Sequence, residues 1–345
     1  MESVELLKQL TLTAGISGHE SKITQIMKDH LRNYEFDQDR MGNITFIKKG
    51  IQNGKKFLFI AHQDEVGFIV SDILPSGLLK IQNIGGWDPN TLLSSPVDVI
   101  NDDEDKFPGI IGSIPKHFMY GDKKTPEISQ MFVDIGAKDK DDVIDNYKIS
   151  LGSPVIPVCR FNYNENSRRM FSKSFDDRVG IAALIELGWK LRDKDVSDTI
   201  YLCGSVQEEV GTRGAQAIAD YTDADICFVL EGAPADDIPG IPGTPQTCVG
   251  KGVHLRIFDP TLIIPVNLKN KIISIAKKCN IPVQPTVRRG GGTDGRQIHT
   301  ANKGIPTIVL GVPVRYAHSH NCLISLDDYK LLVDLCYNIV IEMGG

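Results

Sequence analysis

The stretch that decides the fold is an apolar run that leads directly into polar residues, Phe57-Leu58-Phe59-Ile60-Ala61-His62-Gln63-Asp64-Glu65. A short continuous run of this kind is typical of a strand that is buried on both faces, as in an α/β sheet. Three later apolar runs have the same form, and each leads to side chains that can bind metal. They are 199–206 before Glu208 and Glu209, 226–230 before Glu231, and 307–310 before His318 and His320.

These polar residues are expected to meet at one edge of a sheet, because open α/β sheets bind ligands beyond the carboxyl ends of their strands. Asp176 and Asp177 lie at a predicted helix start and belong to the same rim. For any one group, a solvent-exposed charge where a strand ends is the commoner meaning, and a lone histidine is more often structural. Agreement among all five groups favours a metal site.

The donor types indicate which metals fit. Two histidines with several carboxylates suit Zn²⁺, Co²⁺ or Mn²⁺ and disfavour a soft thiolate site. Because one catalytic zinc usually takes three protein ligands, the surplus predicts two ions. Glu208 and Glu209 are adjacent, so an extended backbone points them to different sides, and one can bind metal while the other holds a proton. Asp64 either accepts from the second ring nitrogen of His62 or is simply solvated.

The pattern changes between residues 68 and 160. Short apolar runs alternate there with Gly, Pro and Asp turns, which predicts an all-β barrel or sandwich inserted into an α/β domain. The expected catalytic domain therefore comprises residues 1–67 and 161–345, and the expected insert is 68–160. Near the C-terminus, Ser325 is predicted to cap a final helix whose first turn holds Asp327 and Asp328.

Composition excludes several classes of protein. The chain has 345 residues, a formal net charge of -6 and 24% charged residues, which are ordinary globular values. This acidic balance offers no footprint for nucleic acid or an anionic membrane, and no apolar run is long enough to span a bilayer. The seven cysteines include no CxxC pair, which favours reduced thiols in a cytoplasmic protein.

The glycine-rich segment 289–295 matches no nucleotide-binding motif. A tight turn that brings backbone close to a ligand is the better interpretation.

The whole chain resembles the glutamyl aminopeptidase family of dinuclear metallo-aminopeptidases, which includes the tetrahedral (TET) aminopeptidases. Six motifs in the same order carry the resemblance. They are AGISGHE (14–20), AHQDEVGF (61–68), FDDRVG (175–180), QEEVG (207–211), GTD (292–294) and RYAHS (315–319). The resemblance implies an α/β metallopeptidase domain with a mixed sheet and helices on both faces, interrupted by an all-β dimerisation domain.

The resemblance also implies a role for each site residue. In this assignment two ions share Asp176, with His62 and Glu231 on one and Glu209 and His318 on the other, while Asp64 orients His62 and Glu208 is the general base. One departure stands out, because the family usually has Asp where this chain has Glu231.

These roles predict a metal-dependent aminopeptidase, with Zn²⁺ or Co²⁺ favoured over Mn²⁺. Arg256 resembles the position where glutamyl members carry an arginine facing the substrate side chain, which predicts a preference for N-terminal Glu or Asp. A surface-strand arginine is an equally good interpretation, and Arg288, Arg289 and Arg315 are rival candidates.

Two other functions are alternatives for this sequence. The first is a non-catalytic relative that binds peptides. Its support is that this chain has Glu231 where the family usually has Asp. An endoglucanase, a label that some family members carry, would need Glu208 and Glu209 as a glycosidase pair, and neighbouring glutamates are poorly placed for that.

The resemblance finally implies self-association. Family members form dimers through the inserted domain and often close into tetrahedral dodecamers. Such a shell would admit short or unfolded peptides as substrates.

Overall fold

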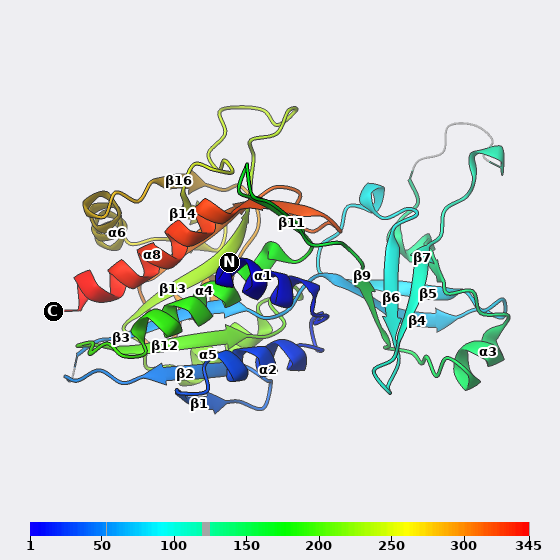
Figure 1. The fold of residues 1–345 in the computed structure, drawn as a ribbon, viewed down its shortest axis with the longest axis horizontal. Coiled ribbons are helices and arrows are strands. Elements are labelled where there is room, and N and C mark those ends of the chain that lie inside the picture. The colour runs from blue at the N-terminus through cyan, green and yellow to red at the C-terminus, as the bar shows by residue number, and fades with distance from the viewer. Residues whose placement is uncertain (53, 119–124, 345) are drawn as a thin grey trace.

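The computed structural model describes residues 1–52, 54–118 and 125–344. The chain forms a large α/β part and a smaller β part that lies beside it (Figure 1). The α/β part holds both the first and the last elements of the chain, and the β part, coloured cyan to green, is made from the middle of the sequence. The expected class, a mixed α/β domain interrupted by an all-β barrel, is therefore confirmed.

The α/β part is built on a nine-stranded sheet with the order β1-β2-β12-β3-β13-β17-β14-β15, in which β16 also pairs with β14. The four central strands β12, β3, β13 and β17 are mutually parallel, and the strands outside them add antiparallel pairs. The strands are β1 (Glu35–Gln38), β2 (Ile44–Lys48), β3 (Lys56–His62), β12 (Thr199–Ser205), β13 (Ile226–Pro234), β14 (Val253–Asp259), β15 (Leu262–Ile263), β16 (Val283–Val287) and β17 (Thr307–Val314).

Helices cover both faces of this sheet. They are α1 (Glu2–Leu12), α2 (Ser21–His30), α4 (Phe175–Leu191), α5 (Arg213–Tyr221), α6 (Val266–Lys278), α7 (Gly295–Ile298) and α8 (Leu326–Met343). Side chains alternate along β3, so Phe57 and Phe59 join the core under α4 and α8, while Leu58 and Ile60 join the smaller core under α5 and α7. Burial on both faces explains why the central strands are continuously apolar.

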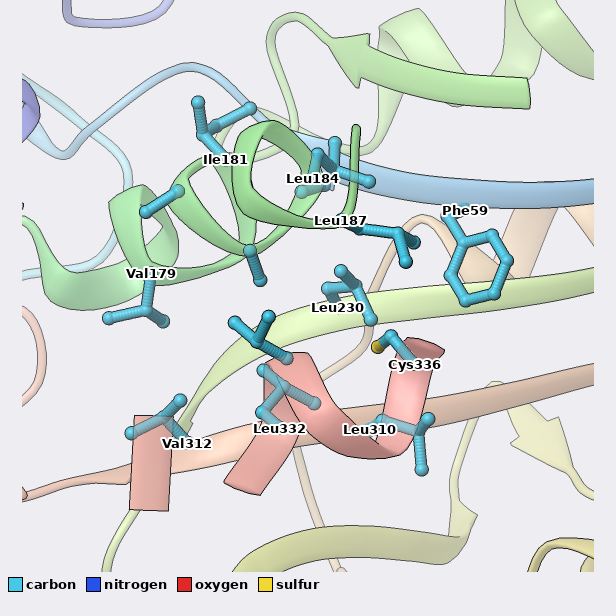
Figure 2. Packing of buried hydrophobic residues seen from close by; sticks show 14 of the residues in the cluster. Phe59, Val179, Ile181, Leu184, Leu187, Leu230, Leu310, Val312, Leu332 and Cys336 are labelled. Carbon is cyan, nitrogen blue, oxygen red and sulfur yellow. The ribbon is translucent and has the colours of Figure 1, made fainter. Parts of the chain in front are cut away.

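The larger core is packed between α4, α8 and the central strands (Figure 2). Its buried side chains include Phe59, Val179, Ile181, Leu184, Leu187, Leu230, Leu310, Val312, Leu332 and Cys336. Phe59 also stacks on Phe228, with ring centroids 4.7 Å apart. This packing gives the central strands a rigid support from which their carboxyl ends extend.

The inserted part is a closed barrel with the strand order β4-β5-β8-β7-β6-β9. Its strands are β4 (Gly67–Ile73), β5 (Leu79–Ile84), β6 (Pro96–Ile100), β7 (Lys106–Ile111), β8 (Phe132–Asp134) and β9 (Pro154–Pro157), and α3 (Lys140–Asp145) lies between β8 and β9. The barrel has its own apolar core, which includes Phe68, Val99 and Val133. The segment 119–124 of the predicted insert lies outside the described residues.

A small sheet of β10 (Asn162–Asn164), β11 (Arg169–Ser172) and β18 (Cys322–Ser325) joins the return from the barrel to the last helix. Here one prediction needs correction. Ser325 occupies the N-cap position of α8, but its hydroxyl makes no capping bond and instead accepts from Arg169 Nη1 at 2.7 Å. Cross-strand pairing of Arg169 with Ser325 brings the stronger, charged donor to the hydroxyl.

Among the described residues, no helix combines the length and the apolar character that crossing a bilayer requires.

Candidate active site

The carboxyl ends of the four parallel strands surround a cavity of about 450 Å³. The side chains that the sequence analysis predicts as metal ligands or as the general base all line this cavity. They are His62, Asp176, Glu208, Glu209, Glu231 and His318. Parallel strands end at one edge of the sheet, so groups separated by up to 256 positions in the chain come together.

Asp176 lies between the two histidines. Its Oδ1 is 3.3 Å from His62 Nε2, and its Oδ2 is 3.4 Å from His318 Nε2. One carboxylate therefore offers a separate oxygen to each side of the site, which is the arrangement of a bridging ligand.

Two overlapping groups of donors share Asp176. In the first, Glu231 Oε2 is 4.0 Å from His62 Nε2, and in the second, Glu209 Oε1 is 3.4 Å from His318 Nε2. Within each group the donor atoms lie within 4.8 Å of one another. The glutamate at 231 therefore still reaches the site, although it is one methylene longer than aspartate. Glu208 lies with His62 and Glu209 in a third group.

Both histidines turn the same ring nitrogen toward Asp176. His62 Nδ1 is 3.1 Å from the Asp64 carbonyl oxygen, and His318 Nδ1 is 2.9 Å from the carbonyl oxygen of Gly86. A ring nitrogen that donates to a carbonyl leaves Nε2 free to bind metal. Sequence reasoning missed Gly86, which follows β5 of the barrel, because a backbone acceptor has no residue-type signal.

Asp64 makes different contacts from those expected. Its carboxylate lies 3.6 Å from His62 Nδ1, farther than its own carbonyl oxygen does. The carboxylate instead accepts from the backbone amides of Glu208 and Glu209, each at 3.0 Å, and from Ser17 Oγ at 2.6 Å. Asp64 is completely buried, so these donors offset the desolvation of its charge.

Asp176 and Asp177 also differ from the expected acidic helix start. Both residues have non-helical backbone angles within α4. Asp177 accepts from the Gly180 amide at 2.9 Å and from the His62 amide at 3.3 Å, so it ties α4 to the end of β3. Just before them, buried Lys173 and Ser174 both donate to Glu65. These contacts hold the segment that carries Asp176 against the strand that carries His62.

The charges of the site favour occupation by cations. Burial is the main cause that raises the pKa of Glu208, Glu209 and Glu231, because ionised carboxylates are crowded away from water. Burial opposes protonation of His318, yet hydrogen bonds with Asp176 and Glu209 raise its pKa to about 11. Glu209 Oε1 is buried and lies 3.4 Å from His318 Nε2, so its charge is far from water. Two divalent cations would balance the four carboxylates, so the donor set fits such ions.

Arginines also line this cavity. Arg256 is 6% exposed, contacts Asp259 Oδ2 at 3.2 Å through Nη1, and leaves its buried Nε without a partner. Arg288 also lines the cavity and donates to the carbonyl oxygen of Pro234 at 2.7 Å. Arg296, which sequence reasoning did not nominate, lies there as well.

The other two rival arginines are not among the residues that line the cavity. Arg315 binds both carboxylate oxygens of Asp237, at 2.7 and 2.6 Å. Arg289 is exposed.

The glycine-rich segment contributes backbone to the cavity wall. Gly290, Gly291 and Gly292 all line it, and Gly291 has a φ of +82°, which favours glycine. The absence of side chains there leaves room in the cavity.

Comparison with known proteins agrees with this geometry. Residues 42–335 match the M42 glutamyl aminopeptidase family. The glutamyl aminopeptidase of Lactococcus lactis is 31% identical, over 95% of this chain and 93% of that protein. The lysyl aminopeptidase of Pyrococcus furiosus is 28% identical, over 98% of this chain and 97% of that protein.

Solved structures of aminopeptidases are also similar to this chain. The TET aminopeptidase of a marine-sediment thaumarchaeon is 37% identical, covers 98% of this chain and 96% of that one, and has a TM-score of 0.94. The TET1 peptidase of Pyrococcus horikoshii, described as assembling into a tetrahedron or a large octahedral shell, is 28% identical, covers 98% and 99%, and has a TM-score of 0.88.

The fold and the site thus define a peptidase. The chain belongs to the M42 glutamyl aminopeptidase family.

Proposed function

We propose that this protein removes N-terminal residues from peptides with the help of two divalent metal ions. The observation that carries the proposal is the position of Asp176, which turns one oxygen toward His62 and the other toward His318. We assign His62 and Glu231 to one ion, Glu209 and His318 to the other, and Asp176 to both. Zn²⁺ and Co²⁺ suit this mixture of nitrogen and oxygen donors best, and Mn²⁺ is also compatible.

Glu208 supplies the proton transfers in this proposal. When bound, the ions would lower the pKa of water and stabilise negative charge on the substrate carbonyl oxygen. Glu208 lines the cavity in a group with His62 and Glu209. It takes a proton from the attacking water and then passes that proton to the leaving amine. The surrounding carboxylates attract the substrate's α-amine and so favour cleavage at N-termini.

We also propose a preference for acidic N-terminal residues. Arg256 stands in the same cavity as the carboxylates, and its unpartnered Nε leaves the guanidinium with donor capacity. Arg288 adds a second positive charge to that wall. A substrate carboxylate would pair with these groups, whereas an N-terminal lysine would be repelled. Because one relative is a glutamyl and another a lysyl aminopeptidase, the arginines of this chain are the support for the acidic choice.

Chelation followed by metal add-back tests the proposed activity. Purified protein should lose activity on aminoacyl chromogenic substrates after chelation, and Zn²⁺, Co²⁺ or Mn²⁺ should restore it at close to two ions per chain. Glutamyl, aspartyl, leucyl and lysyl substrates should be compared in the same assay. A protein that binds no divalent ion and gains no activity with any of them would favour the non-catalytic peptide-binding function instead.

The cellular setting and the assembly are part of the same proposal. All seven cysteines are free, which suits a reducing cytoplasm. We further propose that chains pair through the barrel and close into a larger shell, in line with the tetrahedral or octahedral assembly of TET1. Exposed Ile110, Ile114 and Phe118, each more than half exposed, lie on the barrel part and support an interface there.

A further inference from the structure

The segment that carries Glu208 and Glu209 donates four consecutive backbone amides to side chains from distant parts of the chain. The Val206 amide donates to Asn43 Oδ1 at 2.9 Å, and the Gln207 amide donates to Glu20 Oε1 at 3.1 Å. The next two amides donate to the two oxygens of Asp64. All three acceptor residues are buried.

The carbonyl groups of the same segment are satisfied from the other direction. The Glu208 carbonyl accepts from the Gly211 amide at 2.9 Å and the Thr212 amide at 2.8 Å, and the Gln207 carbonyl accepts from Arg213 at 3.2 Å. Local turns therefore satisfy the carbonyl groups of the segment, and side chains from distant parts of the sequence satisfy its amides. Removal of these side chains would leave one buried and three partly buried amides without partners.

The backbone at this point does not hold its shape unaided. Gln207 has a φ of +56°, in the left-handed region that a residue with a side chain rarely adopts. Such a conformation persists where the surroundings impose it. It lies immediately before Glu208, so any relaxation would rotate the general base and the ligand that follows it.

Glu20 is placed to impose this conformation. It occupies the N-cap position of α2 but makes no capping bond with that helix. Its Oε1 instead accepts from Gly18, at 2.8 Å, as well as from Gln207. Asn43 is held in turn by Asp39, to which its Nδ2 donates at 2.6 Å.

We propose that Glu20 and Asn43, together with Asp64, form a cradle that sets the backbone of residues 206–209 and so aims Glu208 and Glu209 into the cavity. Glu20 and Asn43 act through the backbone and touch neither substrate nor metal, so they are positioning residues. The proposal rests on the aminopeptidase function for its catalytic consequence. The cradle itself is a property of the fold.

Hydrogen–deuterium exchange of the metal-free protein tests the cradle without reference to activity. Glu20→Ala should speed exchange of a peptide spanning 206–212 by about two- to tenfold, the factor for loss of one hydrogen bond. Glu20→Gln should restore most of the protection, because its carbonyl oxygen can accept both amides. Glu104→Ala is the matched control, since Glu104 is exposed and pairs with Lys22 beside the same helix, and it should exchange like wild type.

Kinetics of the metal-loaded enzyme supply the second readout. At saturating metal, Glu20→Ala should lower kcat about tenfold with little change in KM, and Glu20→Gln should recover most of the rate. Wild-type exchange and kcat in a folded Glu20→Ala protein would overturn the proposal, as would equal losses in the Ala and Gln variants.

A further variant covers the case in which Glu20→Ala does not fold. Ser17→Ala deletes the hydroxyl that donates to Asp64 Oδ2. It should speed exchange of the same peptide by a few fold, because the lost bond orients Asp64 while the amides of the segment keep their bonds to it. Unchanged exchange in that variant would contradict the cradle. A wild-type enzyme that is inactive on every peptide but shows the expected exchange pattern would remove the aminopeptidase function and leave the cradle standing.

Discussion

Asp176 is the residue on which both halves of the proposed metal site depend. Its two oxygens lie 3.3 and 3.4 Å from different histidines, whereas the other assigned ligands each serve one side. Burial opposes ionisation of Asp176, but contacts with His318 and His62 hold its pKa below the usual value. It is therefore available as a charged ligand at neutral pH.

Asp176→Asn should reduce bound metal from two ions per chain toward one or none and abolish most activity. The amide keeps the shape of the side chain but replaces one charged oxygen with a donor that cannot bind a cation. Metal analysis by mass spectrometry, alongside kcat, checks this outcome. A variant with two ions and near-normal kcat would show that Asp176 does not bridge.

Glu208→Gln should keep both ions and lower kcat by about 10²–10⁴-fold, the range for a positioned acid–base group. The Glu208 side chain lines the cavity. In the ion pairs described above, His318 contacts Asp176 and Glu209 but not Glu208. Metal content and kcat should be measured on the same preparation. Loss of metal in this variant would place Glu208 among the ligands.

Arg256→Leu should collapse the preference for glutamyl over leucyl substrates while metal content stays unchanged. A charge-assisted pair is worth about 1.5–3 kcal/mol, or roughly 10–150-fold in kcat/KM. Arg289→Leu is a matched control, because Arg289 is exposed and is not among the lining residues. If the wild-type enzyme already favours leucyl or lysyl substrates, the acidic specificity is wrong.

At the scale of elements, the central strands bring the metal ligands together. The loops that follow these strands set the orientation of the ligands. The Asp328 carboxylate, in the first turn of α8, shows how a loop is attached to such an element. It accepts from the amides of Gly250, at 2.5 Å, and Gly252, at 2.8 Å, and so pins the turn before β14. Arg256 lies on β14, so this contact supports the cavity wall.

Burial raises the pKa of Asp328 to about 6, and this predicts a pH-dependent stability. The unfolded chain releases the proton near its ordinary pKa of 3.8, but the folded chain keeps it to higher pH. This group's contribution to folding stability therefore falls as pH rises from about 4 to 6, by roughly 3 kcal/mol in all.

Asp328→Asn has no proton to release, so this contribution should vanish in the variant. Denaturant unfolding of both proteins at pH 4 and pH 7 measures it, and the advantage of the wild type over the variant should shrink at the higher pH. A difference that is the same at both pH values would contradict the prediction.

At the scale of the whole molecule, the barrel is a separate unit that also reaches the active site. Gly86 follows β5 of the barrel, and its carbonyl oxygen lies 2.9 Å from His318 Nδ1. Assembly through the barrel would therefore act on a part of the chain that contacts the site. This contact connects the proposed assembly interface with His318 of the active site.

Light scattering at micromolar concentration should show an assembly larger than a monomer. Ile110→Glu combined with Ile114→Glu should dissociate it, because two charges would replace apolar side chains that are 54% and 51% exposed. Ile51→Glu, at a 66% exposed isoleucine of the α/β part, should leave the barrel-mediated dimer intact. A monomeric wild type would contradict the proposed assembly, and rapid cleavage of a folded protein's N-terminus would argue against a closed shell.

The sequence by itself determined the class of fold and the types of residue at the site. The apolar runs before His62 and before Glu208 predict buried strands from the local sequence alone, because a strand that is buried on both faces is continuously apolar. The barrel strand β9 begins and ends with proline, so its sequence by itself resembles a turn.

Only the tertiary structure decided how those residues are held. Glu20 and Gln207 are 187 positions apart, and Gly86 contributes only a carbonyl oxygen, so neither contact leaves a pattern in the residue types. The Asp64 carboxylate binds Ser17 and the backbone amides of Glu208 and Glu209, although its place beside His62 in the chain predicted an imidazole partner. Hydrogen bonds to backbone depend on where the chain passes in space, and packing of the complete sheet settles that path.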